Sequence, residues 1–380
     1  MKHSLRILTL CYEYPPVGGG GGRVAAQVAA GLVARGHAVR FQTAGMRGVA
    51  TRELHDGVQV YRTPSFRRKM DTCSVAEMGF FVLTSLAPTL RHIREWKPDV
   101  IHAHFAVPTG LLAWLATRTG DVPYVITAHL GDVPGGVPEQ TNGLFRFVKP
   151  LTRPIWRHAA EITAVSSSVA ALAEDAYRRS PVVIFNGMPL ATPAPVEIHN
   201  PVRIVFVGRM SVQKDPVCAI LALSRIADLP WTVDFIGDGP LLGEARSAAI
   251  SEKVDHRIRF HGWLPSARVN ALMRGADVLL LSSQSEGLPM VGVEALMAGL
   301  AIVAPNIPGV RDIVIDGENG RLASPPGNPV SLAAALRSTL NPKVLPNYRT
   351  ASLKLAAHFD INRSVTAYED LLIRVATLAD

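Results

Sequence analysis

Cysteine is scarce in this chain of 380 residues, which has only Cys11, Cys73 and Cys218. The three lie far apart, their number is odd, and no CxxC or Cys/His spacing accompanies them. The sequence therefore predicts neither a disulfide framework nor a zinc site. This cysteine usage favours a reducing cytosol as the compartment.

Long hydrophobic runs are also missing. The apolar part of residues 4–11 is too short for a signal peptide and predicts a first strand. Residues 100–117 are uncharged, but they include two histidines and a proline, which favours a strand followed by a helix over a membrane span. We therefore expect no transmembrane helix.

Charge is modest in amount and uneven in distribution. Charged residues make up 18% of the chain and hydrophobic ones 48%, which indicates a globular protein long enough for two domains. Residues 1–195 hold 21 Lys and Arg against 13 Asp and Glu (+8), whereas residues 196–380 hold 18 of each. The excess predicts an anionic partner for the first half, either a membrane surface or an acidic acceptor. No pattern typical of a nucleic-acid reader is present, so nucleic acid is not expected as a partner.

Strands and helical stretches alternate along the chain, which predicts an α/β fold with doubly wound parallel sheets. We place a domain boundary at residue 195/196, with Ala191–Pro195 as linker. The strands expected in the first half are Arg6–Cys11, Ala38–Thr43, Val58–Arg62, Val100–Ala103, Tyr124–Ala128, Glu161–Val165 and Val182–Phe185.

The most informative stretch is residues 286–294, in which Glu286 and Glu294 are separated by seven residues. A buried strand is expected just before it, and Pro289 suits the first turn of a helix that ends at Gly299. Glu286 then precedes the helix N-terminus, and Glu294 lies roughly 7–8 Å along the helix axis from Pro289.

A helix N-terminus with a carboxylate on either side suits a nucleotide-sugar. The helix N-terminus that follows Glu286, Gly287 and Leu288 offers N–H groups to a phosphate, and each carboxylate can accept hydrogen bonds from sugar hydroxyls. The structural alternative is that Glu286 caps the helix and Glu294 makes a surface ion pair.

Two further candidates lie in the first half. Gly18 to Gly22 are five consecutive glycines before an expected helix, Val24–Ala34, so Gly18 and Gly19 could bring backbone N–H groups to an anion. A dinucleotide site is the alternative, but the second strand lacks the acidic residue that would bind ribose. His129 follows an expected strand, where catalytic groups gather, although a lone histidine is also a common structural residue.

In the second half, Arg209 and Lys214 flank a turn before a helix and could converge on a diphosphate. Gly237 and Asp238 follow another expected strand, where a base or ribose could lie against the backbone. No Asp-x-Asp pair occurs, so we predict no metal site and no cofactor.

Basic and apolar residues are combined in two neighbouring stretches, Ser65–Met70 and Met78–Leu83, followed by Arg91, Arg94 and Lys97. This combination is typical of a surface that makes peripheral contact with an anionic membrane. A solvated loop followed by a core helix is the alternative.

With these motifs assembled, the chain resembles the GT4 family of retaining glycosyltransferases, which have the GT-B fold. The resemblance covers nearly the whole length. It depends on the loop from Pro15 to Gly19, on His129, on Gly208-Arg209 with Lys214, on Gly237 to Pro240, on the Glu286-x7-Glu294 spacing, and on Pro308-Gly309 followed by Asp316-Gly317 and Asn319-Gly320.

The resemblance implies two Rossmann-like domains facing across a cleft. Residues 1–195, with a final helix at about 361–380, would bind the acceptor, and residues 196–360 would bind a nucleotide-diphosphate-sugar with UDP or GDP. Arg209 and Lys214 would hold the diphosphate, and Glu294 the ribose. Glu286 with the backbone from Leu288 through Pro289 to Met290 would contact the sugar.

Gly18 and Gly19 would approach the phosphates, and His129 would lie near the anomeric carbon. The expected activity is metal-independent transfer to a lipid-linked or polysaccharide acceptor in cell-envelope or exopolysaccharide biosynthesis, in the cytoplasm or at the inner membrane face. The alternatives are a non-catalytic nucleotide-sugar-binding protein and a GT-B sugar epimerase or phosphorylase.

Overall fold

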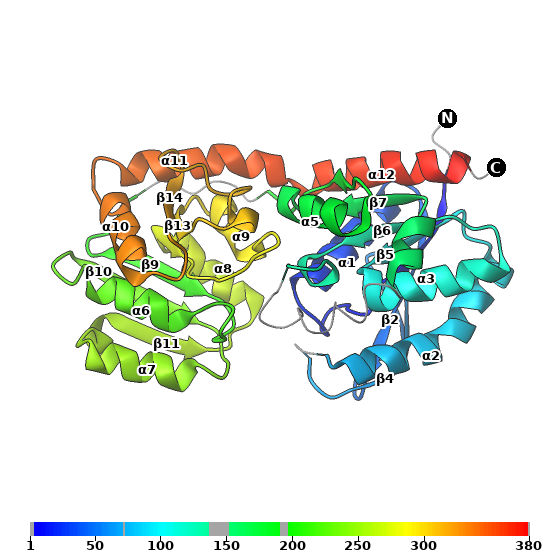
Figure 1. The fold of residues 1–380 in the computed structure, drawn as a ribbon, viewed down its shortest axis with the longest axis horizontal. Coiled ribbons are helices and arrows are strands. Elements are labelled where there is room, and N and C mark those ends of the chain that lie inside the picture. The colour runs from blue at the N-terminus through cyan, green and yellow to red at the C-terminus, as the bar shows by residue number, and fades with distance from the viewer. Residues whose placement is uncertain (1–3, 71–72, 137–151, 191–196, 379–380) are drawn as a thin grey trace. The chain divides into compact units, whose positions relative to one another are not determined.

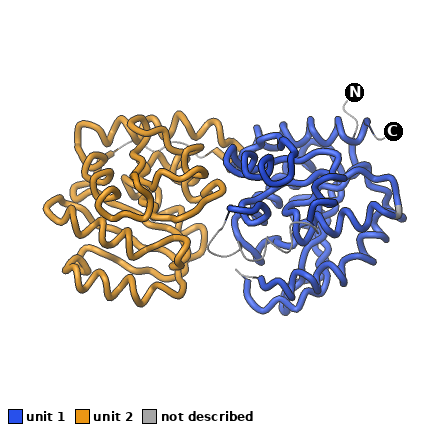
Figure 2. The backbone as a smooth tube through the Cα atoms, in the orientation of Figure 1, with its two compact units in different colours: residues 1–187, 361–380 blue, residues 188–360 orange. Residues whose placement is uncertain are grey.

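The computed structural model describes residues 4–70, 73–136, 152–190 and 197–378. The chain forms two compact units, drawn in blue and orange in Figure 2: unit 1 is residues 1–187 with 361–380, and unit 2 is residues 188–360. The expected linker, Ala191–Pro195, lies outside the described residues. Within the described ranges, no helix is long and apolar enough to cross a membrane.

Unit 1 is built on an eight-stranded sheet in the order β3-β4-β2-β1-β5-β6-β7-β8, in which every pairing is parallel except β3 with β4 (Figure 1). Its elements are β1 (Arg6–Leu10), α1 (Gly20–Ala34), β2 (Ala38–Met46), β3 (Arg52–His55), β4 (Val58–Arg67), α2 (Val75–Arg91), β5 (Val100–His104), α3 (Leu111–Ala116), β6 (Tyr124–Ala128), β7 (Glu161–Ala164), α5 (Ser167–Tyr177), β8 (Val182–Val183) and α12 (Ile361–Thr377).

All seven strands expected in the first half are present, whereas β3 was not foreseen. Its sequence is Arg-Glu-Leu-His, and Leu54 is largely exposed. An edge strand of this kind has no buried face, so it carries no hydrophobic pattern for the sequence to reveal.

Helix α1 begins at Gly20 rather than at Val24, so the expected glycine-rich loop is shorter than predicted. A Cβ on Gly21 would lie 2.8 Å from the ring of Phe105, and one on Gly22 would lie 2.6 Å from Cβ of Glu13. Gly21 and Gly22 therefore let the first turn of the helix pack closely against its neighbours.

Helix α12 packs on α1 within unit 1. Glu369 accepts a hydrogen bond from Nη1 of Arg35 at 2.6 Å and lies 3.2 Å from Nε2 of His37. Gly31 of α1 faces Val365, where a Cβ would be 2.5 Å from a methyl group. The C-terminal helix is thus an integral part of this unit.

Unit 2 has a six-stranded parallel sheet in the order β11-β10-β9-β12-β13-β14. Its core includes Trp231 and the stacked rings of Phe206 and Phe235, 4.7 Å apart. Its elements are β9 (Val202–Val207), α6 (Pro216–Ser224), β10 (Trp231–Ile236), α7 (Leu242–Ser251), β11 (Ile258–Gly262), α8 (Ser266–Arg274), β12 (Val278–Leu280), α9 (Met290–Met297), β13 (Ala301–Pro305), β14 (Gly320–Ala323), α10 (Pro329–Thr339) and α11 (Leu345–Ala356).

Local sequence explains where the helices of unit 2 begin. The Asp215 carboxylate accepts from the Cys218 N–H at 3.1 Å, and Pro216 occupies the first position of α6. Asn328 caps α10 in the same way. Helix α9 begins at Met290, so Pro289 is the extended residue that precedes the helix and does not lie in its first turn as expected. Gly299 follows the helix end at φ +66°, as the sequence predicted.

Candidate active site

The strand order of unit 2 reverses at β9, which pairs with β10 on one side and β12 on the other. In open parallel sheets, ligands bind beyond the carboxyl ends of the strands at such a point. The loops that leave β9 and β12 carry Lys214 and Glu286. They are joined by hydrogen bonds from Nε2 of Gln213 to the Ser285 carbonyl (3.1 Å) and from the Gln284 N–H to the Gln213 carbonyl (2.8 Å).

Lys214 and Glu286 form an ion pair at this point of the sheet. Only 20% of the Lys214 side chain and 7% of the Glu286 side chain are exposed. Oε1 of Glu286 also accepts from the Ser283 hydroxyl at 2.6 Å. The ammonium group is thus held in a partly dehydrated site, where a cation acts more strongly on an anion than it would in water.

The loops around this pair are packed backbone against backbone. A Cβ on Gly237 would lie 1.9 Å from the Gly208 carbonyl oxygen, and one on Gly309 would lie 2.0 Å from the Glu286 carbonyl oxygen. Glycine is therefore required sterically where the loops after β10 and β13 meet those after β9 and β12. This packing fixes the Glu286 backbone.

Three other expected donor-site residues lie nearby along the chain: Arg209 on the loop that carries Lys214, Asp238 on the loop after β10, and Glu294 within α9. Among the described residues, Arg209 makes no hydrogen bond or ion pair with Lys214 or Glu286, and its side chain is exposed. Asp238 is also exposed, and its carboxylate accepts from the Gly239 N–H at 2.7 Å. Glu294 is partly exposed within α9.

Sequence reasoning missed Ser282 and Ser283. The Ser282 hydroxyl lies 2.8 Å from the Lys214 carbonyl oxygen and 2.7 Å from that of Asp215, so it ties the end of β12 to the loop that carries the lysine. Ser283 stands three residues before Glu286, a spacing that could have indicated a side-chain hydrogen bond within the turn.

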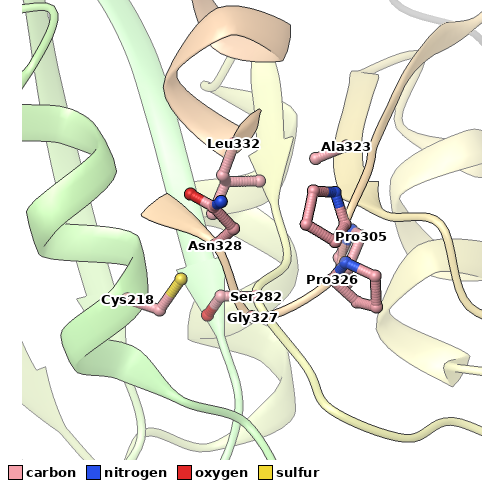
Figure 3. Close-up of a pocket in the computed structure, with 9 residues that line it drawn as sticks. Cys218, Ser282, Pro305, Ala323, Pro326, Gly327, Asn328 and Leu332 are labelled. Atoms are coloured by element: carbon pink, nitrogen blue, oxygen red, sulfur yellow. The ribbon is translucent and has the colours of Figure 1, made fainter. Parts of the chain in front are cut away.

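A small pocket lies beyond the carboxyl ends of β13 and β14 (Figure 3). Its lining is mostly apolar and comes from α6, α10 and the strand ends, including Cys218, Leu332, Pro305 and Ala323. Burial raises the pKa of the Cys218 thiol to about 11, so this group is neutral. A pocket without charged side chains does not suit a diphosphate.

In unit 1, the N–H groups of Gly18 and Gly19 are bonded within the chain. Gly18 donates to the Met70 carbonyl at 2.7 Å, and Gly19 donates to Oε2 of Glu13 at 2.8 Å. Glu13 is buried, and its other carboxylate oxygen lies 3.8 Å from Arg67. The chain thus supplies its own anion at the N-terminus of α1.

His129 follows β6, and its ring stacks on Phe105 with 4.1 Å between the ring centres. Phe105 has φ +74°, a strained conformation for a residue with a side chain. The Asp132 carboxylate accepts from the N–H groups of His129 (2.8 Å) and Ala106 (2.9 Å), so it holds both loops together. Sequence reasoning gave Asp132 no role.

Unit 1 is expected to lose stability in mild acid. His102, His104 and His129 are buried, and burial lowers the pKa of His102 and His129 to about 3 and that of His104 well below its ordinary value. The unfolded groups titrate near 6.5, so stability is full above that pH and falls as pH drops, by about 2 kcal/mol for each histidine at pH 5. Burial raises the pKa of Asp132 to about 7, which offsets part of this loss because its protonated form is favoured.

Urea unfolding followed by hydrogen exchange would measure the free energy of unfolding of each unit at pH 7.5 and at pH 5. The buried histidines among the described residues all belong to unit 1, so unit 2 serves as the internal control. Equal losses in both units would contradict the assignment to these three side chains.

Comparison with known proteins agrees with this architecture. Residues 19–187 match the family described as Glycosyl transferase 4-like domain, and residues 192–352 match Glycosyl transferases group 1. Glycogen synthase of Mycobacterium tuberculosis is 29% identical, over 96% of this chain and 93% of its own length. The 2-deoxystreptamine glucosyltransferase of Streptomyces kanamyceticus is 29% identical, over 81% of this chain and 86% of its own.

Solved structures share the fold at low sequence identity. Sucrose-phosphate synthase from Thermosynechococcus elongatus superposes with a TM-score of 0.83 at 17% identity, covering 98% of this chain and 100% of that one. Anabaena HepE, solved in complex with UDP and glucose, gives 0.75 at 19% identity, covering 97% and 100%.

Two α/β units with parallel sheets, each with polar loops at the carboxyl ends of its strands, define the GT-B class of glycosyltransferase. The activity of the enzyme is thus glycosyl transfer. The chain belongs to the GT4 family of glycosyltransferases.

Proposed function

We propose that this enzyme transfers a sugar, with retention of anomeric configuration and without a metal ion, from a nucleotide-diphosphate-sugar to a lipid-linked or polysaccharide acceptor. The observation that carries the proposal is the Lys214–Glu286 pair at the strand-order reversal of unit 2. A lysine held there can offset negative charge on a departing diphosphate, and Glu286 can accept hydrogen bonds from the transferred sugar.

The other donor-site roles are proposed for residues on the loops after β9 and β10 and on helix α9. Arg209 would share the diphosphate with Lys214, Glu294 would accept from the ribose hydroxyls, and Gly237 with Asp238 would lie along the nucleoside. The complex of HepE with UDP and glucose supports UDP as one donor nucleotide, and GDP is the other candidate.

The remaining site residues have roles in contacting the sugar and the phosphates. The backbone of Gly287, Leu288, Pro289 and Met290 would lie along the sugar next to Glu286. In unit 1, Gly18 and Gly19 would reach the phosphates and His129 the reacting carbon.

The chemistry needs no nucleophilic side chain. The bond from the anomeric carbon to the phosphate oxygen breaks, the acceptor oxygen forms a bond to that carbon on the same face, and the acceptor's proton passes to the departing phosphate. A product of inverted configuration would contradict this mechanism.

Among the described residues, no group of three His, Cys, Asp or Glu side chains is arranged to hold a metal ion. Measuring turnover in EDTA tests the proposed metal independence directly.

Nucleotide binding tests the donor site. Thermal-shift assays with UDP, GDP, ADP and their sugars should show stabilisation by one nucleotide, since a ligand at 100 times its Kd adds about 2.7 kcal/mol. Glu294→Ala should lose the shift. Glu244→Ala, which changes an exposed helical glutamate of the same unit, should keep it. The proposed donor site is contradicted if no nucleotide stabilises the wild type, or if Glu294→Ala is stabilised as much as the wild type is.

The acceptor proposal comes from the basic first half of the chain, and it includes peripheral contact with an anionic membrane at its cytoplasmic face. The competing functions predict different products. A phosphorylase would release sugar phosphate only when inorganic phosphate is added, and a binding protein would bind the nucleotide-sugar without turnover.

A further inference from the structure

The outer side of helix α2 is apolar although it faces solvent. Residues 78–90 contain no charged side chain. Phe81, Val82, Ser85 and Thr89 are buried, whereas Phe80 is 44% exposed and Leu83 74% exposed. The exposed side of the helix is therefore apolar, unlike that of an ordinary surface helix, whose outer side is polar.

Helix α2 runs along the outside of unit 1, beside β4 (Figure 1). The exposed residues of this helix form a stripe along it, made of Val75, Ala76, Gly79, Phe80, Leu83 and Ala87. The helix itself ends at the exposed Arg91. The hydroxyl of Thr84, which could have made this stripe polar, is turned to the Phe80 carbonyl at 3.0 Å. From Val75 to Ala87 the stripe is thus about 18 Å long at about 1.5 Å per residue.

Phe66 adds to this stripe from the end of β4. The pairing register of β2 with β4 shifts after Gly45 and Pro64, leaving Ser65 and Phe66 as extra residues before Arg67. Phe66 adopts φ +54° and is 67% exposed, and its ring contacts that of Phe80 at 4.5 Å. A strained backbone that turns a large apolar side chain outward indicates a functional surface rather than a packing need.

Cations lie at both ends of the stripe. Arg68 and Lys69 follow Phe66, and Arg91, Arg94 and Lys97 follow the helix. Residues 66–97 hold six Lys and Arg against three Asp and Glu, giving +3. The backbone N–H of Arg68 donates to Glu77 at 3.0 Å, which fixes the basic segment against the first turn of α2.

We infer that this apolar face, defined as Phe66, Met70, Val75, Phe80 and Leu83, docks unit 1 on an anionic lipid bilayer. The inference rests on the proposed function in naming the surface that makes the proposed membrane contact. Apolar side chains enter the interface between headgroups and acyl chains while the flanking cations attract anionic headgroups. A second copy is a poorer occupant, because two-fold pairing would set the same basic face against itself.

Co-sedimentation with vesicles tests the inference. The wild type should bind vesicles of equal parts phosphatidylcholine and phosphatidylglycerol and should not bind pure phosphatidylcholine. Phe80→Ser with Leu83→Ser should weaken binding by about tenfold or more. Arg68→Ser with Lys69→Ser should weaken it about fivefold for each cation.

The matched controls lie on unit 2. Ile250→Ser removes an aliphatic side chain that is 66% exposed, against 74% for Leu83, and Lys343→Ser with Arg268→Ser removes two exposed cations. Both controls should bind anionic vesicles as the wild type does. The inference is overturned if the wild type ignores anionic vesicles or if the face variants bind them unchanged. It is also overturned if light scattering shows that Phe80→Ser with Leu83→Ser breaks up an oligomer.

Nucleotide thermal shifts on the same variants separate this inference from the proposed function. Variants that lose vesicle binding but keep the nucleotide response support the docking face as a distinct surface. If the wild type binds vesicles but no nucleotide, the proposed docking face is supported and the proposed donor site is contradicted.

Discussion

Lys214→Ala is expected to lower kcat/KM for sugar transfer by about 10²–10³-fold, the usual cost of removing one preorganised group that stabilises developing negative charge. The lysine is suited to this role because its ammonium group is already held by Glu286 and is only 20% exposed. Little reorganisation is then needed when charge develops on the diphosphate. Initial rates with the nucleotide-sugar found by thermal shift would measure the effect.

Two comparisons separate a chemical effect from a structural one. Lys343→Ala removes an exposed lysine of the same unit and should leave kcat/KM unchanged. When Lys214 is removed, the Glu286 carboxylate keeps its hydrogen bond from the Ser283 hydroxyl but loses its cation. Because this loss can destabilise the fold, the free energy of unfolding must be measured for the same variant. A folded Lys214→Ala enzyme with a wild-type rate would contradict the role given to this residue.

Asp277→Ala is expected to destabilise unit 2 by about 3–5 kcal/mol, because it removes one partner of a buried ion pair. Asp277 is fully buried just before β12. It accepts from Nη1 of Arg349 at 2.8 Å and from the Arg203 N–H at 2.8 Å, and it lies 3.0 Å from Nδ1 of His199. Without the carboxylate, the buried Arg349 guanidinium keeps its hydrogen bonds to the Gly299 and Glu197 carbonyls but loses the negative charge of Asp277. Urea unfolding followed by hydrogen exchange would locate the loss in unit 2.

An exposed ion pair of the same unit provides the comparison. Asp228 accepts from both terminal nitrogens of Arg337, at 2.6 and 2.7 Å, but the pair lies at the surface. Asp228→Ala should therefore change stability far less, since solvent already screens that pair. Similar effects of the two substitutions would show that burial is not what makes Asp277 important.

The turn around Glu286 could be foreseen because local sequence determines it. Pro289 has a fixed φ suited to a helix start, and Gly299 takes the left-handed conformation just after the helix end. A buried parallel strand before the turn follows from an unbroken apolar run. The α/β class with parallel sheets was predictable for the same reason, since strands and helices of this kind alternate through both halves, whereas the GT-B fold was expected only from the resemblance to the GT4 family.

Tertiary contacts set the remaining features, and these could not be foreseen. The close packing of Gly21 in the first turn of α1 depends on the position of Phe105, which is 84 residues further along the chain. The pairing of Lys214 with Glu286 spans 72 residues. Although the sequence marked both residues as site candidates, only the packing of β9 beside β12 brings them into contact.

The carboxylate of Glu13 at the start of α1 changes how a phosphate could bind there. Because Gly19 already donates to Oε2 of Glu13, an arriving phosphate must displace a resident anion instead of filling an open position. The binding free energy would then be the difference between two anions competing for the same N–H group. The loop would exchange one anion for another, so this N–H group has an anionic acceptor both before and after phosphate binds. Its affinity for phosphate then depends as much on the free energy of releasing the Glu13 carboxylate as on the attraction of the helix N-terminus.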